Sequence, residues 1–122
     1  MILLEHLDVD VLPEVPVITV ATLAELSVGP LVTHDPEEQA ARQLRLQETE
    51  AAFDPLPFDA AAARMFGQVA ASLRRSGRKT TARAIDAILA SIALVNELDV
   101  FTCNPKDFNG IDGLGVVALP HP

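Results

Sequence analysis

A carboxylate lies in a segment that is otherwise apolar enough for a protein core. Asp86 is the one ionisable residue of the segment IDAILASIALV, residues 85–95, whose large apolar side chains recur at the three- and four-residue spacing of a helix. A buried carboxylate is normally paired, protonated or bound to a metal ion, because an unpaired buried charge is unfavourable. Asp86 is therefore a candidate metal ligand. Two simpler explanations stay open: it could interact with the positive end of the helix dipole, or it could pair with Arg83.

Three further polar side chains follow predicted strands. Glu25 comes one helical turn after a β-branched strand, and Asn104 and Asp107 come directly after a later strand. Functional groups gather beyond the carboxyl ends of parallel strands, so these residues are candidate partners of Asp86. Each acid also has a local explanation. Glu25 could complete a capping box with Thr22, and Asp107 could cap a short turn.

Basic residues are concentrated directly before the segment that carries Asp86. The 122-residue chain has nine basic and 17 acidic residues and a formal net charge of −8, which argues against a nucleic-acid partner. The stretch RRSGRKTTAR nevertheless holds five of the nine basic residues. Its position beside a candidate acidic site favours binding of a nucleic-acid backbone, although a solvated helix end is the simpler explanation. The five residues are Arg74, Arg75, Arg78, Lys79 and Arg83.

The order of the predicted elements indicates an α/β fold. Strands and helices alternate along the chain, which is typical of a mainly parallel sheet flanked by helices. Asp35 and Asp59 each stand where a helix N-cap is expected. The length fits a single domain over residues 1–122. The predicted strands cover residues 16–20, 100–103 and 115–119, and the predicted helices cover 21–29, 35–52, 59–77 and 82–98.

The composition narrows the cellular context. No stretch is long and apolar enough to span a bilayer, and the first ten residues lack the basic leader of a signal peptide. The single cysteine, Cys103, allows no internal disulfide, which suits a reducing compartment. We therefore expect a cytoplasmic protein without a membrane partner.

Three motifs, in this order, resemble a known family. They are TLAELSVG, RAIDAILASIAL and VFTCNPKDFNGIDGLGVVAL, and the resemblance covers roughly residues 16–119. The chain is similar to PIN domains, and specifically to the VapC-type toxins of bacterial toxin–antitoxin pairs. The resemblance implies a three-layer fold with a central, mainly parallel sheet.

The resemblance also implies an activity and a set of partners. VapC-type toxins are endoribonucleases whose acidic residues hold Mg²⁺ or Mn²⁺. Carried over by motif, the metal ligands are Glu25, Asp86, Asn104 and Asp107, and the three acids among them carry the catalysis. The basic run at residues 74–83 is then expected to bind RNA. The implied partners are an RNA substrate, a VapB-type antitoxin and a second copy of the chain.

The N-terminus departs from the family pattern. PIN domains begin with a hydrophobic strand that ends in an aspartate, well before the motif glutamate. Here Asp8 and Asp10 lie only 17 and 15 residues before Glu25, and neither is followed by the small hydroxyl residues of the motif. We therefore expect an N-terminally incomplete PIN-like domain that lacks the first strand.

This departure leaves alternatives to an active ribonuclease. A catalytically impaired PIN-like protein that binds its antitoxin without nuclease activity fits the same motifs. An unrelated α/β binding domain is a third interpretation.

Overall fold

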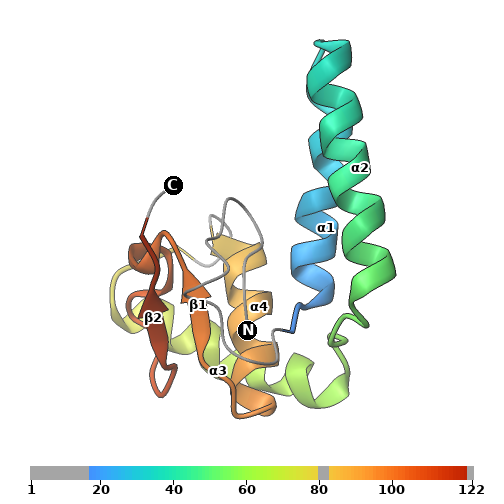
Figure 1. Cartoon of the computed structure of the whole chain (residues 1–122). Helices are drawn as coiled ribbons and strands as arrows, with labels where there is room; N and C mark the ends of the chain where they lie inside the picture. The colour runs from blue at the N-terminus through green and yellow to red at the C-terminus, as the bar shows by residue number, and fades with distance from the viewer. Residues whose placement is uncertain (1–16, 80–82, 121–122) are drawn as a thin grey trace.

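Helices make up most of the described chain. The computed structural model describes residues 17–79 and 83–120 (Figure 1). The elements in these ranges are the α-helices α1 (Val20–Val28), α2 (Pro36–Ala52), α3 (Ala60–Arg75) and α4 (Ala84–Val95), the strands β1 (Val100–Thr102) and β2 (Val116–Ala118), and the 3₁₀ helices η2 (Gly29–Leu31) and η4 (Pro105–Phe108).

Side-chain caps fix where the two longest helices begin. The Asp35 carboxylate accepts a hydrogen bond from the backbone N–H of Glu37 at 3.2 Å, at the start of α2. Asp59 accepts from the N–H of Ala62 at 2.9 Å, at the start of α3. Both caps satisfy backbone donors that have no partner within the helix, and both confirm the sequence prediction.

The predicted strand at residues 16–20 is wrong for its described part. Thr19 makes a single parallel bridge with Leu56, and α1 already begins at Val20. The reason is the Thr19 hydroxyl, which accepts a hydrogen bond from the N–H of Thr22 at 3.2 Å and so caps the helix. Among the described residues, extended pairing of this segment is limited to this bridge, where the N–H of Leu56 donates to the carbonyl of Ile18 at 2.8 Å.

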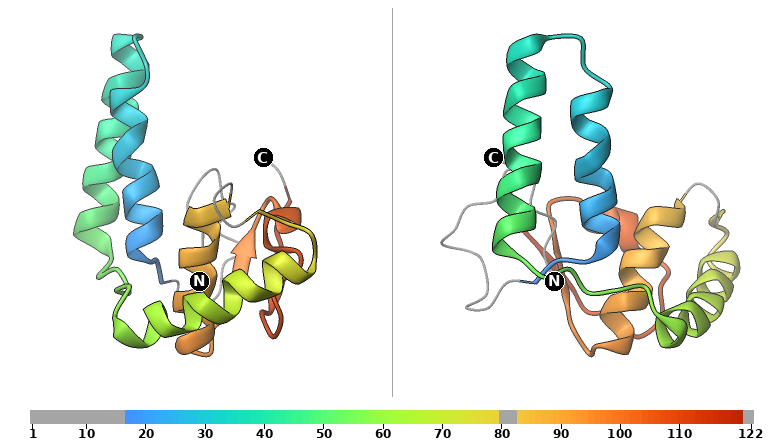
Figure 2. Two further views of the ribbon diagram at one scale, coloured as in Figure 1. Left: turned by 180° about the vertical axis from the view of Figure 1, so that it is seen from behind. Right: turned by 90° about the vertical axis from the view of Figure 1, so that its right-hand side faces the viewer.

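The two strands lie side by side in the parallel arrangement that the sequence predicts. Val100 is paired with Val116 and Thr102 with Ala118. Helices α3 and α4 cover one face of this pair in the views of Figures 1 and 2. The fold is therefore α/β with parallel strands, as expected.

The core is centred on α4. Leu89 and Ile92 of this helix are fully buried, and so are Leu73 of α3 and Val100 of β1. Helix α4 ends at Val95, three residues before the predicted end, because Glu97 adopts a positive φ of 56°. Its central position explains why the helix has almost no polar face.

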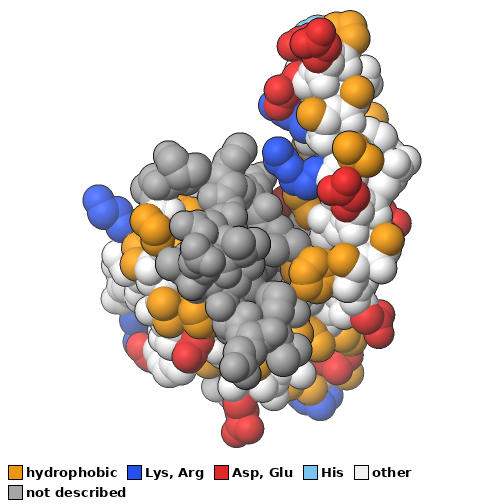
Figure 3. Space-filling view, in the orientation of Figure 1, with side chains coloured by type: hydrophobic (Ala, Val, Ile, Leu, Met, Phe, Trp, Pro, Cys, Tyr) orange, Lys and Arg blue, Asp and Glu red, His pale blue; other side chains and the backbone are white. Residues whose placement is uncertain are grey.

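Helices α1 and α2 form a hairpin that projects from this body (Figures 1 and 2). Arg42 of α2 holds the hairpin together, because its Nη1 donates to the carbonyl oxygen of Gly29 at 2.9 Å. Leu31 and Val32, at the turn, are 80% and 63% exposed. Acidic and hydrophobic side chains share the visible surface of the hairpin (Figure 3). Of the helices described, none has the length and apolar character needed to cross a membrane.

The central position of α4 leads to a stability prediction. Leu89→Ala should lower the free energy of unfolding by about 2–5 kcal/mol, because it leaves a cavity in a closely packed core. Leu44→Ala is the matched control, since Leu44 lies on α2 and is 55% exposed, and it should change that free energy by less than about 0.5 kcal/mol. Urea unfolding followed by circular dichroism measures both. Equal losses for the two variants would contradict a core centred on α4.

Candidate acidic site

Asp86 lies at the edge of the core. It stands in the first turn of α4, and its side chain keeps 22% of its surface exposed. The next residue, Ala87, is fully buried, and its carbonyl accepts a hydrogen bond from the buried Ser91 hydroxyl at 2.6 Å. The helix therefore packs tightly just beyond Asp86, while the carboxylate itself faces the boundary between core and solvent.

Asp107 lies near Asp86 but comes from the connection between β1 and β2. It lies on η4, which follows β1 after a short turn. The N–H of Asn104 donates to the Thr102 hydroxyl at 3.0 Å, and the N–H of Asp107 donates to the carbonyl of Asn104 at 3.0 Å. Phe108 is 2% exposed and anchors η4 in the core. These contacts hold Asp107 within the η4 turn. The N-cap of that turn is Asn104, so the possible capping role of Asp107 is wrong.

Arg83 joins the two acids. Its Nη1 atom lies 2.6 Å from Oδ1 of Asp107 and 3.9 Å from Oδ2 of Asp86. The pairing with Asp86 was one of the alternatives left open by the sequence. The pairing with Asp107, 24 residues away in sequence, had no signal in the sequence. Asp86, Arg83 and Asp107 are called the acidic site below.

Electrostatics at this site favour the neutral form of Asp86. Burial raises the pKa of its carboxyl above the ordinary value, the negative charge of Asp107 raises that pKa further, and Arg83 lowers it. The two acids are thus close enough to repel each other. Two carboxylates in this relation form a place where a cation is stabilised.

Glu25 is not brought into this group in the described structure. It is exposed on α1, a helix that packs against α4. The possible capping box of Thr22 and Glu25 is wrong, because the N-cap of α1 is Thr19 and not Thr22. Asn104 is also exposed. Over residues 17–79 and 83–120, no three or more acidic, histidine or cysteine side chains converge to hold a metal ion. The ligand roles of Glu25 and Asn104 stay predictions.

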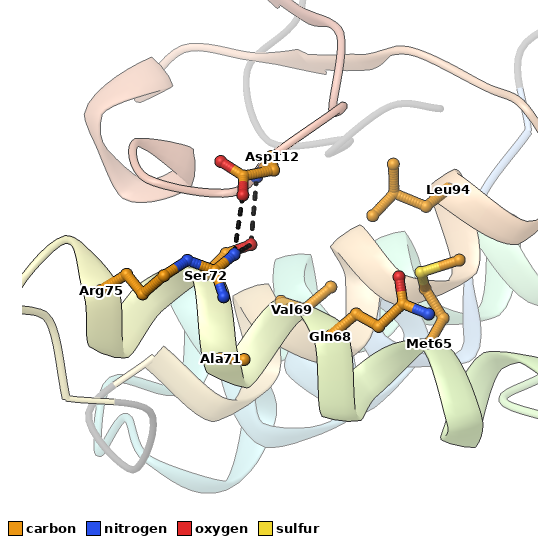
Figure 4. A pocket seen from close by; sticks show the side chains of 8 residues that line it. All are labelled: Met65, Gln68, Val69, Ala71, Ser72, Arg75, Leu94 and Asp112. Carbon is orange, nitrogen blue, oxygen red and sulfur yellow. Dashed lines mark hydrogen bonds and ion pairs between the residues drawn. The ribbon is translucent and has the colours of Figure 1, made fainter.

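The basic run does not form a uniform surface. Arg74 and Lys79 are exposed. Arg75 donates to Asp112 at 2.8 Å and to the Ser72 hydroxyl at 3.3 Å (Figure 4).

Arg78 and Arg83 differ from the other basic residues of the run. Arg78 is half-buried, and its buried Nη1 atom has no hydrogen-bond partner among the described residues. Arg83 belongs to the acidic site. The RNA-binding role of the run stays a prediction, and Arg74 and Lys79 are its most accessible members.

Figure 4 shows a separate cavity of about 280 Å³ beside α3. Its lining does not include Arg83, Asp86 or Asp107. The Arg75–Asp112 ion pair lies at one end, and the other side chains are mostly uncharged. The lining residues are Met65, Gln68, Val69, Ala71, Ser72, Arg75, Leu94 and Asp112.

Comparisons with known proteins identify the family of this chain. The model of the PIN domain family matches residues 2–114. Ribonuclease VapC5 of Mycobacterium tuberculosis is 36% identical over 114 residues, which make up 93% of this chain and 82% of the relative. The crystal structure of VapBC-5 from the same organism, a member of the VapBC family of toxin–antitoxin systems, matches with a TM-score of 0.78 and 34% identity, over 97% of this chain and 91% of that one.

More distant structures share the fold. VapBC2 from Rickettsia felis, bound to a promoter DNA fragment, gives a TM-score of 0.70 at 22% identity, over 84% of this chain and 73% of that one. FitAcB from Neisseria gonorrhoeae gives 0.68 at 24% identity, over 82% and 72%. The chain therefore belongs to the PIN domain family and, within it, to the VapC type.

The family match begins earlier than the three motifs do. It starts at residue 2, whereas the resemblance that the motifs carry covers roughly residues 16–119. Asp8 and Asp10 lie outside the described residues. The expectation of an incomplete N-terminus stays a prediction.

The raised pKa of Asp86 gives a pH dependence of stability with a definite sign. Folding favours the protonated carboxyl, so the stability that Asp86 contributes is fully present below its ordinary pKa of 3.8 and is lost as the pH rises through the higher folded value. Asp86→Asn removes this titration. Its free energy of unfolding should therefore rise relative to the unmodified chain between about pH 3 and about pH 7.

Urea unfolding in metal-free buffer across this pH range measures the difference between the two chains. The sign would be wrong if Asp86→Asn instead lost stability relative to the unmodified chain as the pH rises. That result would mean that the attraction of Arg83 outweighs burial and the charge of Asp107.

Proposed function

We propose that this chain is an endoribonuclease toxin of the VapC type whose acidic site uses Mg²⁺ or Mn²⁺. One observation carries the proposal. Asp86 of α4 and Asp107 of η4 come from different elements, and the same Arg83 nitrogen lies 3.9 Å from one carboxylate and 2.6 Å from the other. Repelling carboxylates of this kind are common at functional sites. The similarity to Ribonuclease VapC5 supplies the reaction class.

The residues present fit a hard divalent cation. Carboxylate oxygens are its preferred ligands, and Mg²⁺ usually keeps several waters while binding one or two carboxylates and the phosphates of the substrate. Asp86 and Asp107 would hold the ion, and Glu25 and Asn104 complete the proposed ligand set. A bound ion of this type supplies Lewis acidity toward the phosphate and lowers the pKa of water.

The protein itself supplies position and charge. Helix α4 and η4 are both anchored in the core, through Leu89 and Phe108, so the two carboxylates are held on rigid elements. Arg74 and Lys79 extend from the exposed end of α3 and the following turn, where they can contact RNA phosphates. They partly offset the negative net charge of the chain at the place where a polyanion approaches.

The proposed partner is a VapB-type antitoxin. Its support is the similarity to VapBC-5, a toxin–antitoxin system. Exposed apolar residues at the turn of the α1–α2 hairpin, Leu31 and Val32, are of the kind that partner proteins cover. A homodimer and a cytoplasmic location complete the proposal.

A second candidate is a VapC-type protein that binds its antitoxin and does not cleave RNA. Arg83 favours it, because this guanidinium already neutralises Asp107 at 2.6 Å, as in a structural ion-pair network. The two candidates differ in whether the chain cleaves RNA with the help of Asp86.

Asp86→Asn should lower Mn²⁺-dependent RNA cleavage by a factor on the order of 100 or more. The loss of a direct metal ligand weakens metal binding at least as much as the loss of a group that only hydrogen-bonds to a ligand. Asp54→Asn is the matched control, since Asp54 is an exposed carboxylate between α2 and α3. It should keep full activity. Cleavage of a structured RNA pool with and without Mn²⁺ gives the readout. No cleavage by the unmodified chain favours the second candidate, whereas equal cleavage by both variants would contradict the ligand role of Asp86.

A double variant tests the basic run. Replacing Arg74 and Lys79 by Gln should weaken RNA binding and lower the slope of log K against log salt by about 0.7 for each lost phosphate contact with single-stranded RNA. Arg64→Gln, also on α3 and exposed, should leave the slope unchanged. Fluorescence anisotropy across a salt titration measures both. An unchanged slope in the double variant would mean that the basic run is a solvated helix end that does not bind RNA.

A further inference from the structure

Arg83 differs from the other paired arginines in what it faces. The Arg75–Asp112 pair is open to solvent, with side chains 65% and 77% exposed, and Arg42 pairs with Glu38 along one helix. Arg83 is 33% exposed and approaches two carboxylates from two elements, Asp107 closely and Asp86 more loosely. It is therefore the local counter-ion of a pair of acids that repel each other.

A divalent cation at these acids meets Arg83 directly. The guanidinium lies 2.6 Å from Oδ1 of Asp107, so it occupies a direction from which an ion would be bound. Two positive groups at the same oxygen also repel each other, most strongly at a partly buried site. An ion that binds Oδ1 of Asp107 therefore competes with the guanidinium for that oxygen.

The charges give this competition a consequence for RNA. When both carboxylates are ionised, they and Arg83 together carry one net negative charge, which repels a phosphate. A divalent cation reverses the sign of that total. If the guanidinium leaves Asp107, its planar set of donors becomes available, and such a set suits a phosphate group.

We propose that Arg83 is a positioning residue that acts as an exchangeable counter-ion: it holds Asp86 and Asp107 together without metal, is displaced from Asp107 when a divalent cation binds, and then contacts the RNA phosphate. The inference rests on the proposed function and adds an order to it, metal first and RNA second. In this view Arg83 lowers metal affinity and raises RNA affinity, which are opposite effects of one side chain.

The test measures Mn²⁺ binding to the full chain without RNA, from the electron paramagnetic resonance signal of free Mn²⁺. Arg83→Gln removes the competitor and should bind Mn²⁺ about fivefold more tightly, which corresponds to the upper range of a partly exposed ion pair. Arg83→Lys keeps a positive charge and should bind within about twofold of the unmodified chain. Arg75→Gln is the matched control, and its Mn²⁺ affinity should not change.

Kinetics with RNA give the second readout. Arg83→Gln should raise the KM for RNA at saturating Mn²⁺ although it binds the metal more tightly, and Arg83→Lys should raise KM less. A purely structural role of Arg83 would not give tighter Mn²⁺ binding and a higher KM for RNA in the same variant. Weaker or unchanged Mn²⁺ binding in Arg83→Gln would overturn the inference, as would an unchanged KM. Where Arg83→Gln does not fold, Mn²⁺ binding by Arg83→Lys that is more than about fivefold weaker overturns it too.

The experiments distinguish a failure of the proposed function from a failure of the inference about Arg83. If the unmodified chain binds Mn²⁺ and cleaves RNA but the Arg83 variants do not separate the two affinities, only the exchange of the counter-ion is wrong. If the unmodified chain shows neither Mn²⁺ binding that depends on Asp86 nor cleavage, the proposed function is wrong and this inference fails with it.

Discussion

The charge at the start of α4 constrains the rest of the structure. Asp86 lies in the first turn of a helix that packs against α1, α3 and η4, so its carboxylate is held at the edge of the core. Burial and the nearby Asp107 both oppose its ionisation, and Arg83 is the one described side chain that is shown to offset them. A charge held under these conditions is unfavourable for stability alone, which is why such arrangements are more often found at functional sites.

The fold supports this site with very little sheet. β1 and β2 contribute three residues each, yet β1 leads directly into η4, whose buried Phe108 places Asp107 opposite α4. The connection from β1 to β2 therefore also positions part of the acidic site. It carries the second acid of the site, as expected for functional groups beyond the carboxyl end of a parallel strand. The α1–α2 hairpin projects from the body that holds these residues (Figure 1), and α1 packs against α4 at its base.

Local signals in the sequence predicted those parts of the fold that depend on neighbouring residues. The helices were predicted from their spacing, the caps at Asp35 and Asp59 from their residue types, and the parallel pairing from the alternation of elements. The strand at residues 16–20 failed because β-branched residues favour extended structure, whereas Thr19 also caps helices well, and tertiary context decides between the two. The Arg83–Asp107 contact joins residues 24 positions apart, and no pattern in a single sequence reports such a distance.

The central claim is that Asp86 and Asp107 form one site for a divalent cation and that Arg83 occupies part of it beforehand. A crystal structure of the full chain grown with Mn²⁺, with data collected at the manganese absorption edge, addresses this most directly. The expected result is an anomalous peak in contact with both carboxylates, with the Arg83 guanidinium turned away from Oδ1 of Asp107. A peak elsewhere, or an Arg83–Asp107 ion pair that persists beside an occupied site, would contradict it.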